Sequence, residues 1–171
     1  IIATQDANLG MGGPAMIEGG GLGRFSPKEI GPISEQVEYG VVDISVSDEE
    51  EAMAMAKKYV SYFQGTFTKW TAPDQGKLRD CVPDNRKFAY DVHRVIETLS
   101  DVDSFLELRP QFAKNMVTGF IRIEGKPMGV IANSTSHLGG AIDSDAADKA
   151  ARFMQCCDAF GIPILSLCDA P

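Results

Sequence analysis

The alternation of apolar runs and turn residues between positions 115 and 171 restricts the fold more than any other part of this chain. Met116–Ile123 and Pro127–Ala132 are apolar runs that flank Glu124-Gly125-Lys126. Two such runs around a turn that contains glycine predict a β-hairpin.

A loop, a helix and another strand are predicted after the hairpin. The loop at 134–142 contains Gly139-Gly140-Ala141, and a helix starts near Ser144. Gly161 is typical of a helix end, and residues 162–168 are so apolar that they predict a buried strand covered on both faces. One face of the helix is apolar and consists of Ala146, Ala150, Phe153 and Cys157. This order predicts an α/β fold whose loops gather at one edge of a sheet.

Residues 1–65 predict two strands and one well-capped helix. Ile1–Ala3 and Gly40–Val46 have the β-branched content of strands. Ser47, followed three residues later by Glu50, forms a capping box at the start of a helix. The apolar face of that helix is expected to contain Ala52, Ala56, Tyr59, Val60 and Phe63.

The middle of the chain predicts a linker and a second helix. Residues 66–86 are polar, contain prolines and show no periodicity, and Trp70 is expected to anchor them to a neighbouring surface. A helix is predicted over 88–99, where His93 is expected to be structural and partly exposed. Asp101 and Asp103 follow it in a sequence that is typical of a solvated turn with capping side chains.

The composition excludes several classes of function. The net charge of −8 argues against nucleic-acid binding, which requires basic patches. Four cysteines without a CxxC pair predict reduced thiols in a cytoplasmic protein, and two histidines make a metal site improbable. Neither a signal peptide nor an apolar run near the ~20 residues of a membrane span is recognisable.

The glycine loop has two interpretations. Gly139-Gly140-Ala141, placed between a strand pair and a helix N-terminus, can direct backbone N–H groups at an anion. Alternatively, it is a tight turn without a ligand. The spacing alone favours neither interpretation.

Longer motifs carry a resemblance to a known family. FIRIEGKPMGVIAN, followed by GGAIDSDAADKAARFMQCCDAFGIPILSLCDAP, resembles the start of the C-terminal half of the carboxyltransferase component of biotin-dependent acyl-CoA carboxylases. GMGGPAMIEGGGLG and GVVDISV resemble the end of the N-terminal half, and VPDNRKFAYDVHRVIETLSDVDSFLEL resembles the bridge between the halves. The resemblance extends over the whole chain but corresponds only to the middle of the family sequence.

The resemblance implies a fold and its division. We expect an α/β, crotonase-like superhelix of ββα units. Residues 1–65 would be the C-terminal part of the N-terminal half, 66–86 the linker, and 87–171 the N-terminal part of the C-terminal half.

The resemblance also implies a reaction, in which CO₂ passes from carboxybiotin on a carrier protein to the α-carbon of a short acyl-CoA. In that family the biotin ureido nitrogen takes the acyl α-proton and the enolate attacks CO₂. The protein mainly supplies backbone N–H pairs that stabilise the developing oxyanions.

The resemblance assigns site residues by position. Gly140 and Ala141 are candidate catalytic amides, and Lys149 matches a recurrent lysine that orients a loop or a phosphate, unless it is a solvated helix residue. The remaining candidates for substrate binding are Gly12, Gly13, Pro14 and Gly139. The main oxyanion motifs of the family fall outside the matched stretch, so the 171 residues by themselves are expected to be inactive.

Alternatives remain at the level of function. The parent protein is either a carboxylase component or a biotin-dependent decarboxylase with the same chemistry, or the chain is a non-catalytic crotonase-like binding or assembly module. Expected partners are acyl-CoA and a biotin carrier or biotin carboxylase component. A homo-oligomer is expected because incomplete halves would expose strand edges and apolar surface.

Overall fold

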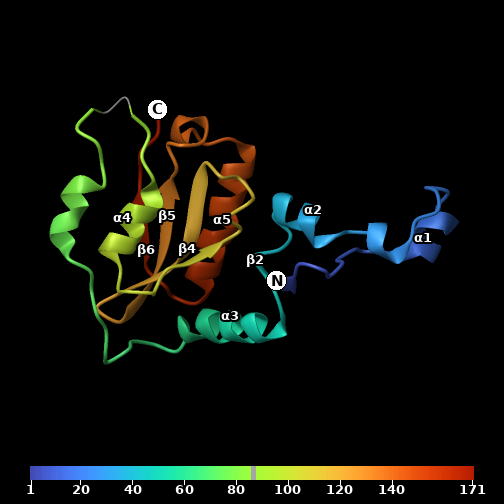
Figure 1. Cartoon of the computed structure of the whole chain (residues 1–171), viewed down its shortest axis with the longest axis horizontal. Helices are drawn as coiled ribbons and strands as arrows, with labels where there is room; N and C mark the ends of the chain where they lie inside the picture. The colour runs from blue at the N-terminus through green and yellow to red at the C-terminus, as the bar shows by residue number, and fades with distance from the viewer. Residues whose placement is uncertain (86–87) are drawn as a thin grey trace.

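A four-stranded sheet forms the centre of the molecule (Figure 1). The computed structural model describes residues 1–85 and 88–171. The strands lie in the order β3-β4-β5-β6, with antiparallel pairing from β3 to β5 and parallel pairing between β5 and β6. Their bounds are β3 Leu106–Leu108, β4 Met116–Ile123, β5 Lys126–Asn133 and β6 Ile164–Leu167.

Helices cover both faces of this sheet. α4 (Val92–Leu99) packs on one face, where Val117 and Ile121 of β4 meet Ile96. α5 (Ser144–Ala159) packs on the other, where Phe120 of β4 meets Phe153. Successive side chains of a strand point to opposite faces, so a strand covered on both sides is apolar throughout. This explains why β4 is apolar at most positions and is buried from Met116 to Arg122.

The predicted hairpin is confirmed. Met116 pairs with Asn133 and Ile123 with Lys126, which leaves Glu124 and Gly125 as a two-residue turn. Both turn residues have positive φ, 52° and 75°, as a type I′ turn requires. The carboxylate of Asp101 accepts hydrogen bonds from both turn amides, at 3.0 and 2.7 Å. Asp101 thus has the capping role expected of this segment, but the expectation that it is solvated is wrong, because the side chain is buried.

The long helix α5 is also confirmed. Asp143 caps it by accepting from the Ala146 amide at 2.9 Å, and Gly161 follows its end with φ 64°. All four residues of the predicted apolar face are buried.

The expectation of a strand buried on both faces at 162–168 is wrong. Only Ile164–Leu167 is strand, it lies at the edge of the sheet, and Ile164 is 37% exposed. An apolar run fixes the strand but cannot show which neighbours cover it.

Residues 1–46 form a small sheet and a projection. β1 (Ile2–Thr4) pairs in parallel with β2 (Ile44–Val46), so the strand predicted over 40–46 is limited to its last three residues. Gly40 has φ 70° and lies against the Phe112 ring, where an added Cβ would come within 2.6 Å of the ring. The segment between β1 and β2 extends away from the main sheet (Figure 1). It carries α1 (Pro14–Gly19), the 3₁₀ turn η1 (Pro27–Glu29) and α2 (Ile33–Glu38).

The helix α3 (Glu49–Ser61) begins one residue later than its predicted cap implied. Asp48, not Ser47, caps it and accepts from the Glu51 amide at 2.9 Å. The Glu51 carboxylate accepts from the amide and the hydroxyl of Ser47, both at 2.8 Å. Ser47 therefore lies just before the helix, and its partner within the helix is Glu51 rather than the predicted Glu50. The inner face holds Tyr59 and other apolar residues, whereas Val60, predicted on that face, is exposed.

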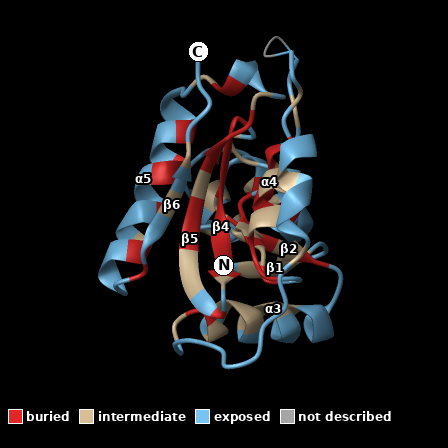
Figure 2. Ribbon diagram, turned by 90° about the vertical axis from the view of Figure 1, so that its left-hand side faces the viewer, coloured by how far each residue is buried: buried red, intermediate tan, exposed pale blue. Residues whose placement is uncertain are grey.

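The two predicted halves share one core. Residues of β2 and of the end of α3 pack against β3, β4 and α5. Figure 2 shows the buried residues in red, gathered in the interior between these elements. The buried members of this cluster are Ile44, Val46, Tyr62, Leu106, Leu108, Phe120, Phe153, Cys157 and Ile162.

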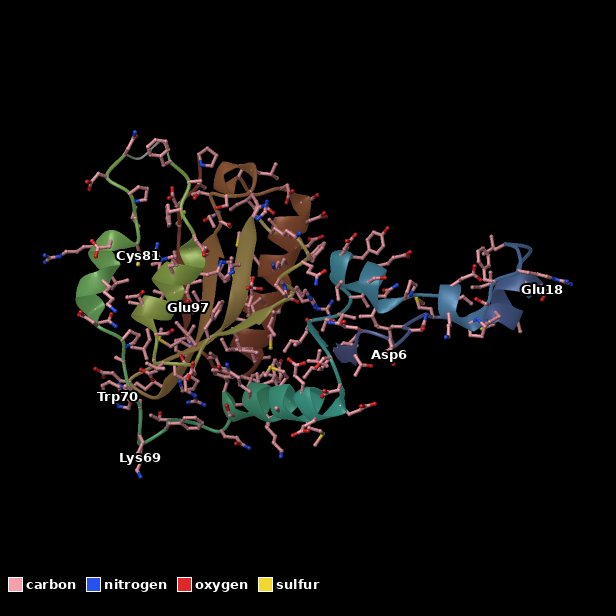
Figure 3. The ribbon with its side chains drawn as sticks, in the orientation of Figure 1. Asp6, Glu18, Lys69, Trp70, Cys81 and Glu97 are labelled. Atoms are coloured by element: carbon pink, nitrogen blue, oxygen red, sulfur yellow. The ribbon has the colours of Figure 1, made fainter. Side chains whose placement is uncertain are left out.

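Residues 66–85 run along the outside of this body. They contain the 3₁₀ helix η2 (Gln75–Asp80), whose Gln75 side-chain amide donates to the Thr98 carbonyl at the end of α4, at 2.7 Å. Trp70 lies at the lower margin of the molecule (Figure 3) and is 48% exposed. Arg122 connects this region to the sheet, because its guanidinium donates to the carbonyls of Ser61, Gly65 and Gly125. The same group lies 3.6 Å over the Phe67 ring.

The helix predicted over 88–99 begins only at Val92. Asp91 caps it by accepting from the His93 amide at 3.0 Å. Among the described residues, no helix has the length and apolar character to cross a membrane.

Candidate functional site

The loop after β5 and the residues after β6 meet at one edge of the sheet, where the order of elements along the chain predicted loops to gather. Asn133, the last residue of β5, is buried and donates from its side-chain amide to the Gly140 carbonyl at 2.8 Å. Its side-chain oxygen accepts from the Asp169 amide, just after β6, at 3.4 Å. Gly140 has φ 82°, and a Cβ there would collide with the Asp169 carbonyl oxygen. Only glycine therefore allows the loop and the end of β6 to approach this closely.

The two amides predicted to be catalytic are engaged within a turn. The Gly140 N–H donates to the His137 carbonyl at 2.9 Å, and the Ala141 N–H donates to the Leu138 carbonyl at 3.1 Å. These bonds form the 3₁₀ turn η3 (Leu138–Gly140). The loop thus forms a tight turn, and both amides are used within it. Gly139, with φ 62°, is exposed at the top of this turn.

A cavity of about 520 Å³ lies beside the turn. Tyr90, Asp169 and Gly139 line this cavity. Tyr90 lies just before α4, and Asp169 lies just after β6. Burial, with a smaller contribution from nearby Asp169, raises the pKa of Tyr90 to about 12, so its phenol stays protonated. The other residues that line the cavity are Val82, Pro83, Phe88, Ala89, Thr135, Ala170 and Pro171.

The sequence left open whether Lys149 is a solvated helix residue, and the structure shows that it is not. It is 1% exposed, and its Nζ donates to the carbonyls of Arg109 and Phe112, both at 2.8 Å. Burial lowers the pKa of the Lys149 amine to about 8. Its donors are directed at the loop after β3, which favours the loop-orienting role over contact with a phosphate.

That loop also joins the two parts of the chain. The Arg109 guanidinium contacts the Asp43 carboxylate at 2.8 Å, and the Arg109 amide donates to the Asp43 carbonyl at 2.8 Å. Asp43, Arg109 and Lys149 line a second cavity, of about 420 Å³, between α3 and α5. The buried Arg109 Nε has no hydrogen-bond partner among the described residues.

Gly12, Gly13 and Pro14 lie apart from the other predicted site residues. Gly13 caps α1 and Pro14 is its first residue. α1 lies at the outer end of the projection, where Glu18 is labelled in Figure 3, and the turn at 138–140 lies at the top of the main body near the C-terminus, far from α1 (Figure 1). Within one copy of the chain, the structure does not bring the two predicted groups together.

Several residues at the edge were missed by sequence reasoning. Asn133, Tyr90 and Asp169 form the contacts there, yet no predicted role was attached to them. One signal was present, because Asn133 and Asp169 are polar residues that immediately follow apolar strand runs. Side chains at the ends of adjacent parallel strands meet at one edge, which is where ligand sites form in α/β sheets. In the described part of the chain, His, Cys, Asp and Glu side chains form no cluster that fits a metal ion.

Comparisons with known proteins agree with this geometry. All 171 residues match the family described as the carboxyl transferase domain. A propionyl-CoA carboxylase beta chain of Roseobacter denitrificans is 39% identical over 140 residues, which cover 77% of this chain and 28% of the relative. The methylmalonyl-CoA carboxyltransferase 12S subunit of Propionibacterium freudenreichii subsp. shermanii is 33% identical over 180 residues, covering 100% of this chain and 34% of the relative.

Solved structures give the same result. A single-chain, multi-domain long-chain acyl-CoA carboxylase matches with a TM-score of 0.97 and 58% identity, covering 100% of this chain and 18% of that one. A transcarboxylase 12S structure, described as a hexamer with hydrolysed methylmalonyl-CoA bound, matches with a TM-score of 0.86 and 32% identity, covering 100% and 36%. The chain thus spans about a third of the length of the curated relatives that it matches in full. The fold is the α/β crotonase-like fold of these carboxyltransferases, and the chain belongs to the carboxyl transferase domain family.

Proposed function

We propose that the protein containing this chain transfers a carboxyl group from carboxybiotin to the α-carbon of an acyl-CoA. The observation that carries the proposal is the match over the full chain, at 58% identity and a TM-score of 0.97, to an acyl-CoA carboxylase. Because that relative is named for long-chain substrates, the short acyl chain expected from the sequence needs a direct test.

The edge at Gly139 fits this chemistry. The cavity beside it has a mixed polar and apolar lining, and its volume of about 520 Å³ lies within the usual range of ligand pockets, so it can accept a compact ring system such as that of biotin. When bound, carboxybiotin supplies the CO₂ that is transferred. What this chain contributes is the shape of the wall: Asn133 holds the Gly140 carbonyl, and the turn presents Gly139 to the cavity.

The predicted site residues take different parts in the proposal. Gly12, Gly13 and Pro14 line the acyl-CoA side of a site that a second copy completes, since one copy separates them from the turn. Lys149 fixes the loop at 109–113. Gly140 and Ala141 can serve as oxyanion donors only if the turn opens, because both N–H groups are used within it.

The proposed carboxyl transfer also implies partners for the protein. We infer a biotin carrier, a biotin carboxylase component and a homo-oligomer, and the last is supported by the hexamer described for the transcarboxylase 12S relative. Four free cysteines, two of them buried, support a reducing, cytoplasmic environment.

The experiment uses the whole protein that contains this chain. Purified protein is mixed with carrier bearing ¹⁴C-carboxybiotin and with acetyl-, propionyl- or palmitoyl-CoA, and acid-stable label on the acyl-CoA is counted. We expect transfer to at least one acyl-CoA, and none by the 171 residues alone. Absence of transfer to every acyl-CoA by the whole protein would refute the proposal. Release of CO₂ from malonyl- or methylmalonyl-CoA without net carboxylation would instead support the decarboxylase.

A further inference from the structure

Two asparagines lie at the open end of the β4–β5 hairpin, opposite its tight turn. Asn115 immediately precedes β4, and Asn133 ends β5, where it pairs with Met116. Both asparagines are buried, at 3% and 5% exposure. A side-chain amide has two N–H donors and an acceptor oxygen, and leaving these without partners away from water is costly. Each side chain must therefore find its partners within the protein.

The two side chains hold two successive carbonyls of the loop after β5. The Asn133 amide donates to the Gly140 carbonyl at 2.8 Å, and the Asn115 amide donates to the Ala141 carbonyl at 2.8 Å. Because a peptide unit is planar, a carbonyl that is fixed also fixes the N–H of the next residue. The bond from Asn133 thus sets the direction of the Ala141 N–H, and the bond from Asn115 sets that of the Ile142 N–H.

Each asparagine also connects the loop to a neighbouring element. The Asn115 amide donates to the Asp143 carboxylate at 3.2 Å, and this carboxylate caps α5. The Asn133 oxygen accepts from the Asp169 amide, just after β6, at 3.4 Å. A Cβ at Gly140 would collide with the Asp169 carbonyl oxygen, so the loop and the end of β6 are also in direct contact. The ends of one hairpin therefore fasten the loop between α5 and β6.

The bond from Asn133 opposes opening of the turn at 138–140. In the closed turn the Ala141 N–H donates to the Leu138 carbonyl. Turning this N–H toward a ligand would rotate the peptide unit that also carries the Gly140 carbonyl, and the bond from Asn133 would break. Gly140 and Asn133 are both buried, so a broken bond between them is not readily replaced by water.

We propose that Asn115 and Asn133 are positioning residues for carboxyl transfer, which together hold the loop at 139–142 closed beside the cavity of about 520 Å³. The catalytic consequence rests on the function proposed above. Gly139 of this loop lines the cavity, whereas neither asparagine does, so both act through the loop. A displacement of about 1 Å at a reacting site can reduce the rate ~100-fold, so loss of either positioning bond should be visible in kcat.

The first test substitutes Asn133→Leu or Asn115→Leu in the whole protein. Leucine keeps the approximate volume of the side chain and removes its hydrogen bonds. The matched control is Gln75→Leu, because the Gln75 amide also donates to backbone carbonyls, those of Pro73 and Thr98, but does not line the cavity. We expect each asparagine variant to lower kcat about tenfold, with a KM for acyl-CoA within about twofold of the wild type. The control should leave both constants unchanged.

The double variant tests whether the two asparagines act together. Once either bond is lost the loop can shift, so the double variant should be less than about threefold slower than the slower single variant. Independent effects would instead multiply, and a double variant ~100-fold slower than the wild type would contradict the joint role.

Asn133→Asp provides a rescue that depends on pH. A protonated carboxyl has the shape of the amide, and it can donate to the Gly140 carbonyl and accept from the Asp169 amide, whereas a carboxylate cannot donate. Burial favours the protonated form, so we expect the ratio of the variant's kcat to that of the wild type to rise at least about fivefold from pH 8 to pH 6. The same ratio for Asn133→Leu should stay constant. The titratable neighbours His137, Asp143 and Asp169 are present in all three proteins, so their effect cancels in these ratios.

Hydrogen–deuterium exchange separates this inference from the proposed function. In Asn133→Leu, amides at 140–142 should exchange faster, while those of the hairpin turn at Glu124 and Gly125 keep their rates. If the wild-type protein shows no carboxyl transfer, the proposed function fails, and the exchange result still decides whether the asparagines hold the loop.

Four results would overturn the positioning role. They are unchanged exchange at 140–142, equally accelerated exchange at Glu124 and Gly125, which marks general destabilisation, a kcat within twofold of the wild type in both single variants, and a ratio for Asn133→Asp that does not change with pH. A single variant faster than the wild type would also overturn it, because opening of the turn would then limit the reaction.

Discussion

At the scale of single residues, Lys149 shows how a charged side chain can act as a structural group. Its three N–H donors are directed at the carbonyls of Arg109, Phe112 and Ala113, at 2.8, 2.8 and 3.5 Å. Arg109 and Ala113 have positive φ, 56° and 44°, which non-glycine residues rarely adopt. The lysine therefore stabilises a loop conformation that the backbone preferences of Arg109 and Ala113 do not favour.

Lys149→Met tests this role. The substitution keeps the length of the side chain but leaves buried carbonyls without a donor, so we expect a loss of about 3 kcal/mol in the free energy of unfolding. Urea titration followed by circular dichroism measures it. The same substitution at exposed Lys57 on α3 should change the free energy by less than about 0.5 kcal/mol. Equal stability of Lys149→Met and Lys57→Met would contradict the loop-holding role.

The burial of Lys149 could have been read from the sequence. Positions 146, 149, 150 and 153 have the spacing of one helix face, and the other three residues were assigned to that face. Residue type alone suggested a solvated lysine. What the sequence could not provide was the acceptor set, because Arg109 and Phe112 lie about 40 positions earlier and reach Lys149 only through the sheet.

At the scale of elements, His93 connects α4 to β3. Its Nδ1 lies 2.8 Å from the Asp91 carboxylate and its Nε2 lies 3.0 Å from the Glu107 carboxylate. The hydrogen bond to Glu107 is the main cause that raises the pKa of His93 from 6.5 to about 9, and Asp91 adds to it while burial opposes it. The histidine is thus expected to be charged at neutral pH and to bridge two carboxylates.

The pH dependence of stability follows with a definite sign. Because the folded state has the higher pKa, the stabilisation is fully present below about pH 6.5 and is lost as the pH rises through about 9. We expect the difference in unfolding free energy between the wild type and His93→Gln to shrink over this interval. The lowered pKa of Lys149, about 8, makes stability change with the opposite sign in the same pH range. Lys149 is present in both proteins, so its effect cancels in the difference between them. His137→Gln, at an exposed position, is the control. A difference that stays constant from pH 6 to pH 9.5 would exclude the bridge.

The elements that the sequence predicted best are those specified by contacts close in the chain. The hairpin from Met116 to Asn133 depends on one turn, and α5 depends on its cap and on Gly161. Two of the errors lie where distant residues decide. β6 is an edge strand, and Asp101 is buried because the hairpin turn, more than 20 residues later, supplies its donors. The edge network was missed for the same reason, since its members are brought together only by the strand order.

At the scale of the whole molecule, the main core joins residues that were predicted to belong to separate halves. Phe120 of β4 is completely buried, and its ring lies 5.2 Å from Tyr62 beyond α3 and 5.1 Å from Phe153 of α5. Arg122 adds polar contacts to the same junction by donating to the Ser61 carbonyl at 2.7 Å. Residues 66–85, the described part of the linker predicted at 66–86, therefore lie between two parts that are already packed together.

Phe120→Ala measures this coupling. Loss of a fully buried phenylalanine should cost about 3–5 kcal/mol, and native-state hydrogen exchange should show α3 and β4 losing protection by the same amount. Phe25→Ala, on the projection between β1 and β2, makes the same change at an exposed side chain and should affect neither element. If β4 were weakened while α3 kept its protection, the two parts would be separate cooperative units.

This shared core has a consequence for synthesis on the ribosome. Tyr62 and Phe63 are made before their main partners, and Phe153 and Cys157 follow them by about 90 residues, which takes ~5–20 s at usual rates of elongation. During that interval α3 exists without the surface that it later covers, so its apolar face is available to chaperones. Slow translation of the stretch between Gly65 and Cys157 would lengthen this exposure, and we therefore expect the yield of folded protein to depend on codon choice there more than at positions 158–171.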